Sequence, residues 1–235
     1  MTNDNTFTAD ASQPPSPRVI GVVWVLYFVI GALGALLTRG IIVSTDAAST
    51  ANNILAHATL YRAGFAVDLV SNLIYIVLTA LLLGFFRRVN PTLASVAAFF
   101  SLAGCIVQLM GELLRLSPTV VLSNAPLAAA FAPHQLQAAA LLSVLLYRTV
   151  FQISFVLFAC FELATGFLIL RSTFLPRWLG WWWIAGSTAW LTFLWPPLAT
   201  SIWPLLVAGG AAEFALPIWL LVKGGGGSTW RRIVE

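Results

Sequence analysis

The chain has 235 residues, of which 60% are hydrophobic and only 9% are charged, and its formal net charge is +4. A soluble domain usually carries about 25% charged residues, so this composition excludes a soluble globular protein. The basic residues are scattered at the ends of apolar runs instead of being clustered, which argues against a nucleic-acid-binding protein. We therefore expect an all-α integral membrane protein whose main partner is the lipid bilayer, with no nucleic acid bound.

The two ends of the chain differ from its middle. Residues 1–17 are polar and contain three prolines, so they are expected to form a disordered tail. Residues 224–235 read GGGGSTWRRIVE and are expected to form a flexible basic tail. The stretch 18–223 between them is expected to be one transmembrane helical domain.

Six apolar runs in this central stretch are long enough to cross a bilayer, which takes about 20 residues. We expect helices, because open strands leave their backbone groups unsatisfied in lipid. The predicted fold is a bundle of six spanning helices with short amphipathic helices in the outer loops. The six runs are Val19–Thr38, Ala63–Phe86, Thr92–Leu116, Thr149–Leu170, Trp178–Trp195 and Ile202–Val222.

The positions of the basic residues predict the orientation of the bundle. If the N-terminus is inside, eight basic residues lie on the cytoplasmic side and four lie outside, as the positive-inside rule favours. Both termini are therefore expected in the cytoplasm of a plasma membrane protein. The inner set is Arg18, Arg87, Arg88, Arg171, Arg177, Lys223, Arg231 and Arg232, and the outer set is Arg39, Arg62, Arg115 and Arg148.

Two longer loops fall on the outer side. In the first, Thr45 or Asp46 can cap a short amphipathic helix, which would lie on the membrane surface or cover the bundle. Its apolar face comprises Ala47, Ala51, Ile54, Leu55 and Ala58. The second loop has prolines at 118, 126 and 133. We expect it to re-enter the outer interface and then to form a helix from about Pro133 that leads into the fourth span. The alternative is that residues 134–147 form a separate span.

Polar residues form stripes in the outer halves of three predicted spans. An ionisable residue inside a membrane is expensive unless it has a partner or water, so we expect the stripes to meet. One interpretation is a set of ion pairs that lock the packing of three helices. The other is a water-filled vestibule that binds a polar or zwitterionic ligand. The residues are Asp68, Asn72, Gln108, Glu112, Arg115, Arg148 and Gln152.

Two acids are expected deeper in the membrane. Glu162 follows Arg148 by 14 residues, which places it on about the same helical face and about 21 Å further along the axis. Glu213 precedes Pro217 by four residues, so its carbonyl lacks the helical donor that a proline cannot supply. We expect Glu162 to face the bundle interior with Glu213 as its companion. The pair is either an ion or proton site or a structural contact between helices.

Several stretches carry a resemblance to a known family. They include RVIGVVWVLYFVIG in the first span, DAASTANNILAHATLYRAGFAVDL, LLLGFFRRVNPTLA, RSTFLPRWLGWWW and AEFALPIWLLVKG. The chain resembles the bacterial membrane family catalogued as domain of unknown function 4386, although Thr173 stands where that family usually has a glycine. The resemblance implies a multi-spanning helical protein, includes Asp68 and Glu213 in its pattern, and carries over no catalytic residue.

The leading functional hypothesis is binding or transport of a small polar molecule or proton through an outward-facing polar cavity. The alternative is a structural or sensory membrane protein whose buried charges lock helix packing. A membrane-embedded enzyme acting on lipid comes third, because the chain has no H-E-x-x-H, G-x-S-x-G or Walker motif. No cofactor and no metal are expected.

Overall fold

The computed structural model describes residues 15–224, which fold into helices with no strand among them. The two predicted tails lie almost entirely outside these residues. The helices are α1 (Pro17–Leu37), α2 (Ala47–Ala56), α3 (Ala58–Phe86), α4 (Pro91–Ser123), α5 (Ala125–Ala130), α6 (Pro133–Arg171), α7 (Arg177–Trp190), a 3-10 turn (Leu191–Leu194), α8 (Pro196–Ser201) and α9 (Trp203–Lys223).

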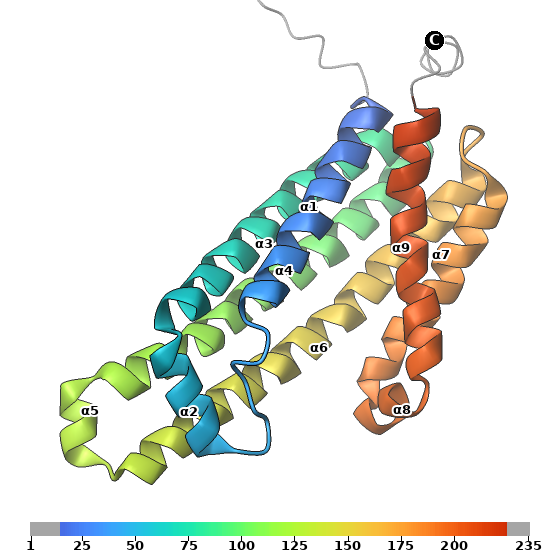
Figure 1. Cartoon of the computed structure of the whole chain (residues 1–235). Helices are drawn as coiled ribbons and strands as arrows, with labels where there is room; N and C mark the ends of the chain where they lie inside the picture. The colour runs from blue at the N-terminus through green and yellow to red at the C-terminus, as the bar shows by residue number, and fades with distance from the viewer. Residues whose placement is uncertain (1–14, 225–235) are drawn as a thin grey trace, which may run out of the picture.

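Four helices, α1, α3, α4 and α6, are each long and apolar enough to cross a membrane. They pack lengthwise, α1 on α3 and α4 on both α3 and α6 (Figure 1). The 14-residue α7 packs on α6, and the 21-residue α9 packs on α7 and α1. The all-α fold expected from the sequence is confirmed, and these four helices are candidate membrane spans among the described residues.

The end of the bundle at which α1 ends and α2 begins is called outer here as a position in the fold and not as a side of the membrane. The loop after α4 at this end differs from the expectation. We expected re-entry at Pro118, which is wrong, since α4 continues through Pro118 to Ser123. A proline leaves the carbonyl four residues earlier without its donor, here the carbonyl of Leu114. The hydroxyl of Ser117 donates a hydrogen bond to that oxygen at 2.9 Å, so the helix continues.

The helix that follows, α6, begins at Pro133 as expected and runs unbroken for 39 residues. Residues 134–147 are therefore the outer part of this helix and not a separate span. At 1.5 Å per residue α6 is about 58 Å long, which exceeds the thickness of a whole bilayer. Figure 1 shows its outer part and the outer part of α4 running together to the turn at α5.

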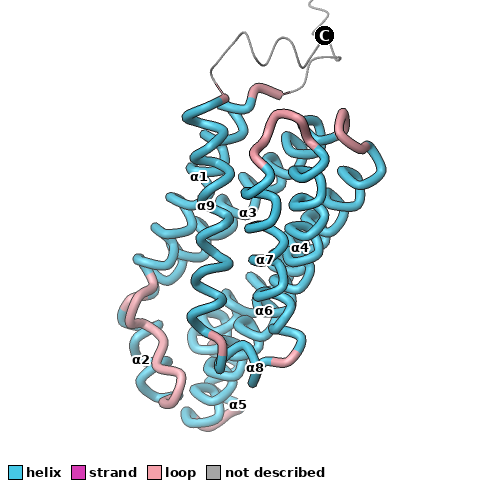
Figure 2. The backbone as a smooth tube through the Cα atoms, turned by 90° about the vertical axis from the view of Figure 1, so that its right-hand side faces the viewer, coloured by secondary structure: helices cyan, strands magenta, loops and turns pink. Residues whose placement is uncertain are grey.

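The short helix α2 covers the outer end of the bundle. The carboxylate of Asp46 accepts a hydrogen bond from the Ser49 amide at 3.0 Å and so caps its N-terminus. Ala51 and Ile54 are buried and α2 packs mainly on α6, whereas Leu55 from the expected apolar face is half exposed. Figures 1 and 2 show α2, α5 and α8 together at the end opposite to the start of α1 and the end of α9.

The hydrophobic core lies at the other end of the bundle. Trp24 of α1 and Trp183 of α7 are both buried and meet edge to face with ring centroids 5.6 Å apart. Nearby α6 and α7 cross closely, since a Cβ on Gly166 would lie 3.0 Å from the carbonyl oxygen of Gly180. This dense packing contrasts with the outer half, where the helices enclose open space.

Candidate functional site: a polar cavity in the outer half

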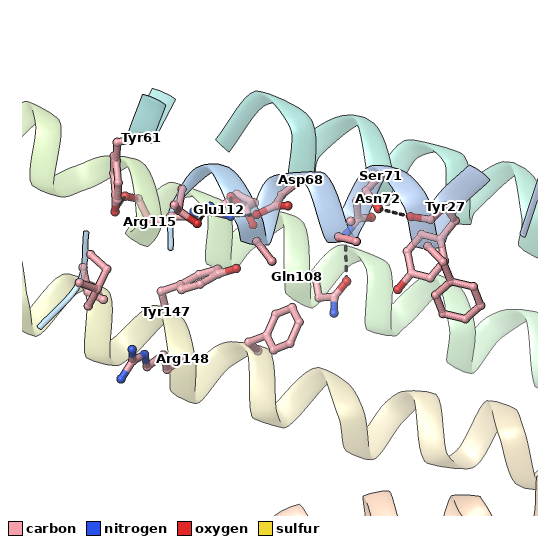
Figure 3. A pocket seen from close by; sticks show the side chains of 18 of the residues that line it. Tyr27, Tyr61, Asp68, Ser71, Asn72, Gln108, Glu112, Arg115, Tyr147 and Arg148 are labelled. Carbon is pink, nitrogen blue, oxygen red and sulfur yellow. Dashed lines mark hydrogen bonds and ion pairs between the residues drawn. The ribbon is translucent and has the colours of Figure 1, made fainter. Parts of the chain in front are cut away.

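A cavity of about 540 Å³ lies between α1, α3, α4 and α6, beneath the loop that connects α1 to α2. Figure 3 shows polar side chains from α3, α4 and α6 around it. Six of the seven polar residues predicted from the sequence line this cavity. They are Asp68, Asn72, Gln108, Glu112, Arg115 and Arg148.

Arg115 of α4 is the centre of the polar network. Its guanidinium group forms an ion pair with Asp68 of α3 and lies 3.8 Å from Glu112, one helical turn earlier. The guanidinium carbon also lies 5.6 Å from the centre of the Tyr147 ring on α6, in cation–π contact. Since the Arg115 side chain is only 7% exposed, these contacts are what compensates its charge inside the bundle.

Two glycines let the helices approach this network. A Cβ on Gly34 of α1 would overlap the carboxylate of Asp68, and a Cβ on Gly64 of α3 would overlap the methyl group of Thr38. The Asp68 carboxylate therefore lies directly against the backbone of α1. Glycine at both positions places the ion pair at the junction of α1, α3 and α4.

Some buried polar atoms in the cavity wall make no hydrogen bond to the part of the chain that the structure describes. The amide nitrogen of Asn72 donates to the Gln108 side-chain oxygen at 3.1 Å, which joins α3 to α4. The other polar atom of Asn72, Oδ1, and the Oε2 atom of Glu112 are buried and make no hydrogen bond with any described residue. Buried polar atoms in proteins normally have hydrogen-bond partners. These two atoms therefore indicate that water or a ligand supplies the missing hydrogen bonds in this wall.

Arg148 lies at the rim, away from the Asp68–Arg115 pair. Its guanidinium Nη1 donates to the hydroxyl of Ser44 at 2.5 Å, and the side chain is exposed. Gln152, one turn further along α6, is half-buried and is not among the residues that line the cavity. The face of α6 that meets the cavity instead presents Val144, Tyr147, Arg148 and Phe151, at helical spacing.

The two deeper acids lie apart from the cavity. Glu162 of α6 is 4% exposed, and its carboxyl group lies beside that of Glu213 on α9. The indole N–H of Trp190 is near both carboxyl groups without making a hydrogen bond. Tyr27, which lines the cavity, contacts Tyr75 with ring centroids 4.7 Å apart, and both tyrosines are close enough to the acids to interact electrostatically.

Sequence reasoning missed the aromatic part of the site. The hydroxyl of Tyr61 donates to the backbone carbonyl of Arg115 at 2.6 Å, and the ring of Tyr147 lies against the Arg115 guanidinium. A signal for Tyr147 was present, because it directly precedes Arg148 at the outer start of a predicted span. No spacing pattern marks Tyr61, since its partner is a backbone atom 54 residues away.

Fold and site together define a helical protein with four candidate membrane spans and a polar cavity within the bundle. Residues 19–224 match the family model described as Domain of unknown function (DUF4386), and the chain belongs to that family. Comparisons with curated proteins and with solved structures gave no significant match. Within residues 15–224, no group of three or more His, Cys, Asp or Glu residues is arranged to hold a metal ion.

Proposed function

We propose that this DUF4386 protein is a multi-pass plasma membrane protein whose cavity binds a small polar molecule from the outer side. The observation that carries the proposal is the combination of about 540 Å³ of space with buried polar atoms that make no hydrogen bond within residues 15–224. Cavities of this size are typical of small-molecule sites. A cluster that only locked helices together would need neither the space nor the unpartnered acceptors.

The proposed topology has six spans, with α7 and its 3-10 turn as the fifth and α9 as the sixth. In support, α1 begins and α9 ends at the same end of the bundle (Figure 1). That end also carries six basic residues of the described chain, against four toward the opposite end, which favours cytoplasmic termini. The six are Arg18, Arg87, Arg88, Arg171, Arg177 and Lys223.

Thiol labelling tests both the topology and the access of water to the cavity. In a protein whose native cysteines are replaced by alanine, we expect Ala35→Cys on the cavity wall to react with an impermeant reagent added to intact cells. Ser228→Cys in the C-terminal tail should be protected until the cells are opened. Labelling of Ser228→Cys in intact cells would overturn the topology. If Ala35→Cys does not react, water does not reach the cavity, and the polar cluster only locks the packing of the helices.

Binding itself is testable with a thermal-stability screen of small polar compounds on the protein in lipid nanodiscs. A ligand at 100 times its Kd stabilises the folded state by about 2.7 kcal/mol. Ala32→Trp, which places an indole on the cavity wall, should abolish the stabilisation, whereas Leu33→Trp on the exposed side of α1 should retain it. If Ala32→Trp leaves binding intact, the ligand is not in this cavity.

Glu162 and Glu213 are proposed as a proton-binding pair below the cavity. Two carboxyl groups side by side in a low-dielectric interior cannot both ionise, so they share a proton. The titratable groups that face them from other helices are Tyr27 of α1 and Tyr75 of α3, and both tyrosines also lie near Cys105 of α4. Glu162→Gln should change the pH dependence of ligand binding between pH 5 and 8, and an unchanged pH profile would leave the pair with a structural role only.

A further inference from the structure

We infer that the ligand of the cavity is a small organic cation whose ammonium group is held by Glu112. This inference rests on the proposed function and narrows its ligand to one chemical class. It starts from the charges of the inner wall, where two carboxylates, Asp68 and Glu112, face one guanidinium group, that of Arg115. The second cation of the cavity, Arg148, is at the exposed rim and is bonded to Ser44.

The geometry of Arg115 leaves the Oε2 atom of Glu112 without a direct partner, although the hydroxyl of Tyr147 lies near the same carboxyl group. The guanidinium Nη1 is engaged with Asp68, and its distance of 3.8 Å from Glu112 Oε2 is too long for a hydrogen bond. Glu112 is only 6% exposed, and its Oε2 atom makes no hydrogen bond within the described chain. An ionised carboxylate only accepts hydrogen bonds, so a cationic N–H donor is the group that complements it.

The remaining wall fits an organic cation better than a metal ion. Tyr27, Phe28 and Phe151 line the cavity, and aromatic faces attract organic ammonium groups. A hard metal ion would need several oxygen ligands converging on one point, and the described residues hold no such cluster of three acids or histidines. The buried Oδ1 of Asn72 offers the ligand a second polar contact, from α3.

The test uses three compounds of nearly equal size and shape that differ in the charge of one group. They are phenethylammonium, 2-phenylethanol and 3-phenylpropionate, titrated by calorimetry into the wild-type protein in lipid nanodiscs at pH 7. We expect saturable binding of the ammonium compound, at least tenfold weaker binding of the alcohol and no binding of the carboxylate. Ala32→Trp should prevent binding of the ammonium compound, which locates it in the cavity.

Variants assign the recognition to Glu112. Glu112→Gln should weaken ammonium binding at least tenfold, while the matched control Asp46→Asn, which removes a carboxylate outside the cavity, should leave it unchanged. If Glu112→Gln does not fold, the inference is still tested by comparing the affinities of the ammonium compound and the alcohol for the wild-type protein. Equal binding of those two compounds, or no binding of the ammonium compound, overturns the inference.

The outcomes separate this inference from the proposed function. Binding of the alcohol or the carboxylate in preference to the ammonium compound, lost in Ala32→Trp, would overturn the organic cation and support a polar-ligand site. Full ammonium affinity in a folded Glu112→Gln variant would also overturn the inference. An inert Ala35→Cys together with a failed compound screen would overturn the proposed function itself.

Discussion

The ion pair between Asp68 and Arg115 is expected to be a main determinant of bundle stability. Asp68→Asn keeps the shape of the side chain but leaves the Arg115 guanidinium, which is 7% exposed, without its principal counter-ion. Removing one partner of a fully buried pair costs about 3–5 kcal/mol. Here the Asp68 side chain is 24% exposed, and Glu112 remains 3.8 Å from the guanidinium, so we expect a lower cost of about 2–3 kcal/mol.

A double-mutant cycle measures the pair directly. Arg115→Met removes the guanidinium and retains much of the side-chain volume, and combining it with Asp68→Asn removes both partners. We expect the two substitutions to be non-additive, with a coupling free energy of about 2 kcal/mol. The assay is the free energy of unfolding from a denaturant titration in detergent micelles.

Arg148→Met is the matched control, because it removes a guanidinium at the exposed rim of the same cavity. Its effect should be within about 0.5 kcal/mol of zero, as is usual for exposed positions. A coupling energy below about 0.5 kcal/mol for Asp68 and Arg115, or an Arg148→Met as destabilising as Asp68→Asn, would refute the argument that burial makes this pair strong.

Three further predictions concern other parts of the bundle. Glu162→Gln should change the unfolding temperature little, because an amide can still form a hydrogen bond with Glu213, whereas Glu162→Leu should lower the unfolding temperature. Equal unfolding temperatures for the two variants would argue against a contact between the carboxyl groups. Gly166→Ala should destabilise by about 1–3 kcal/mol because its Cβ would crowd the α7 backbone, and a neutral result would show that α6 and α7 can move apart. Hydrogen bonds from Ser49 hold the pKa of Asp46 below its usual value, so its stabilisation of α2 is present above about pH 4 and is lost as the pH falls further. The protection factor of the Ser49 amide, which corrects for the slower intrinsic exchange in acid, should therefore fall in acid in the wild type, with a smaller change in Asp46→Asn.

The sequence predicted the helical membrane fold well because hydropathy reports what lipid requires of every span. It predicted the end of α4 less well, because that end depends on an individual contact. Pro118 would ordinarily end a helix, and only the side chain of Ser117 supplies the missing hydrogen bond. The start of α6 at Pro133 was predictable, because proline favours the first turn of a helix and no residue before the fourth span interrupts that helix.

Most residues of the candidate site were also predictable, because charged and amide side chains are rare in apolar spans and stand out at helical spacing. The exception is Gln152, which shares a stripe with Arg148 but sits beside the cavity-facing row of α6. The contacts of Arg115 with its neighbours were not predictable in detail. They depend on how closely α1 approaches α3 at Gly34 and Gly64, which is a property of packing and not of either helix alone.

The unbroken course of α6 has a mechanical consequence. Tyr147 and Arg148, at the cavity, and Glu162, at the acid pair, are carried by one helix without an internal proline or glycine between them. Glu162 lies about 21 Å along the axis from Arg148, so a tilt of one degree pivoting at the cavity displaces Glu162 by about 0.4 Å. A tilt of α6 as a rigid rod would therefore change the distance between the carboxyl groups of Glu162 and Glu213 wherever α9 does not follow it.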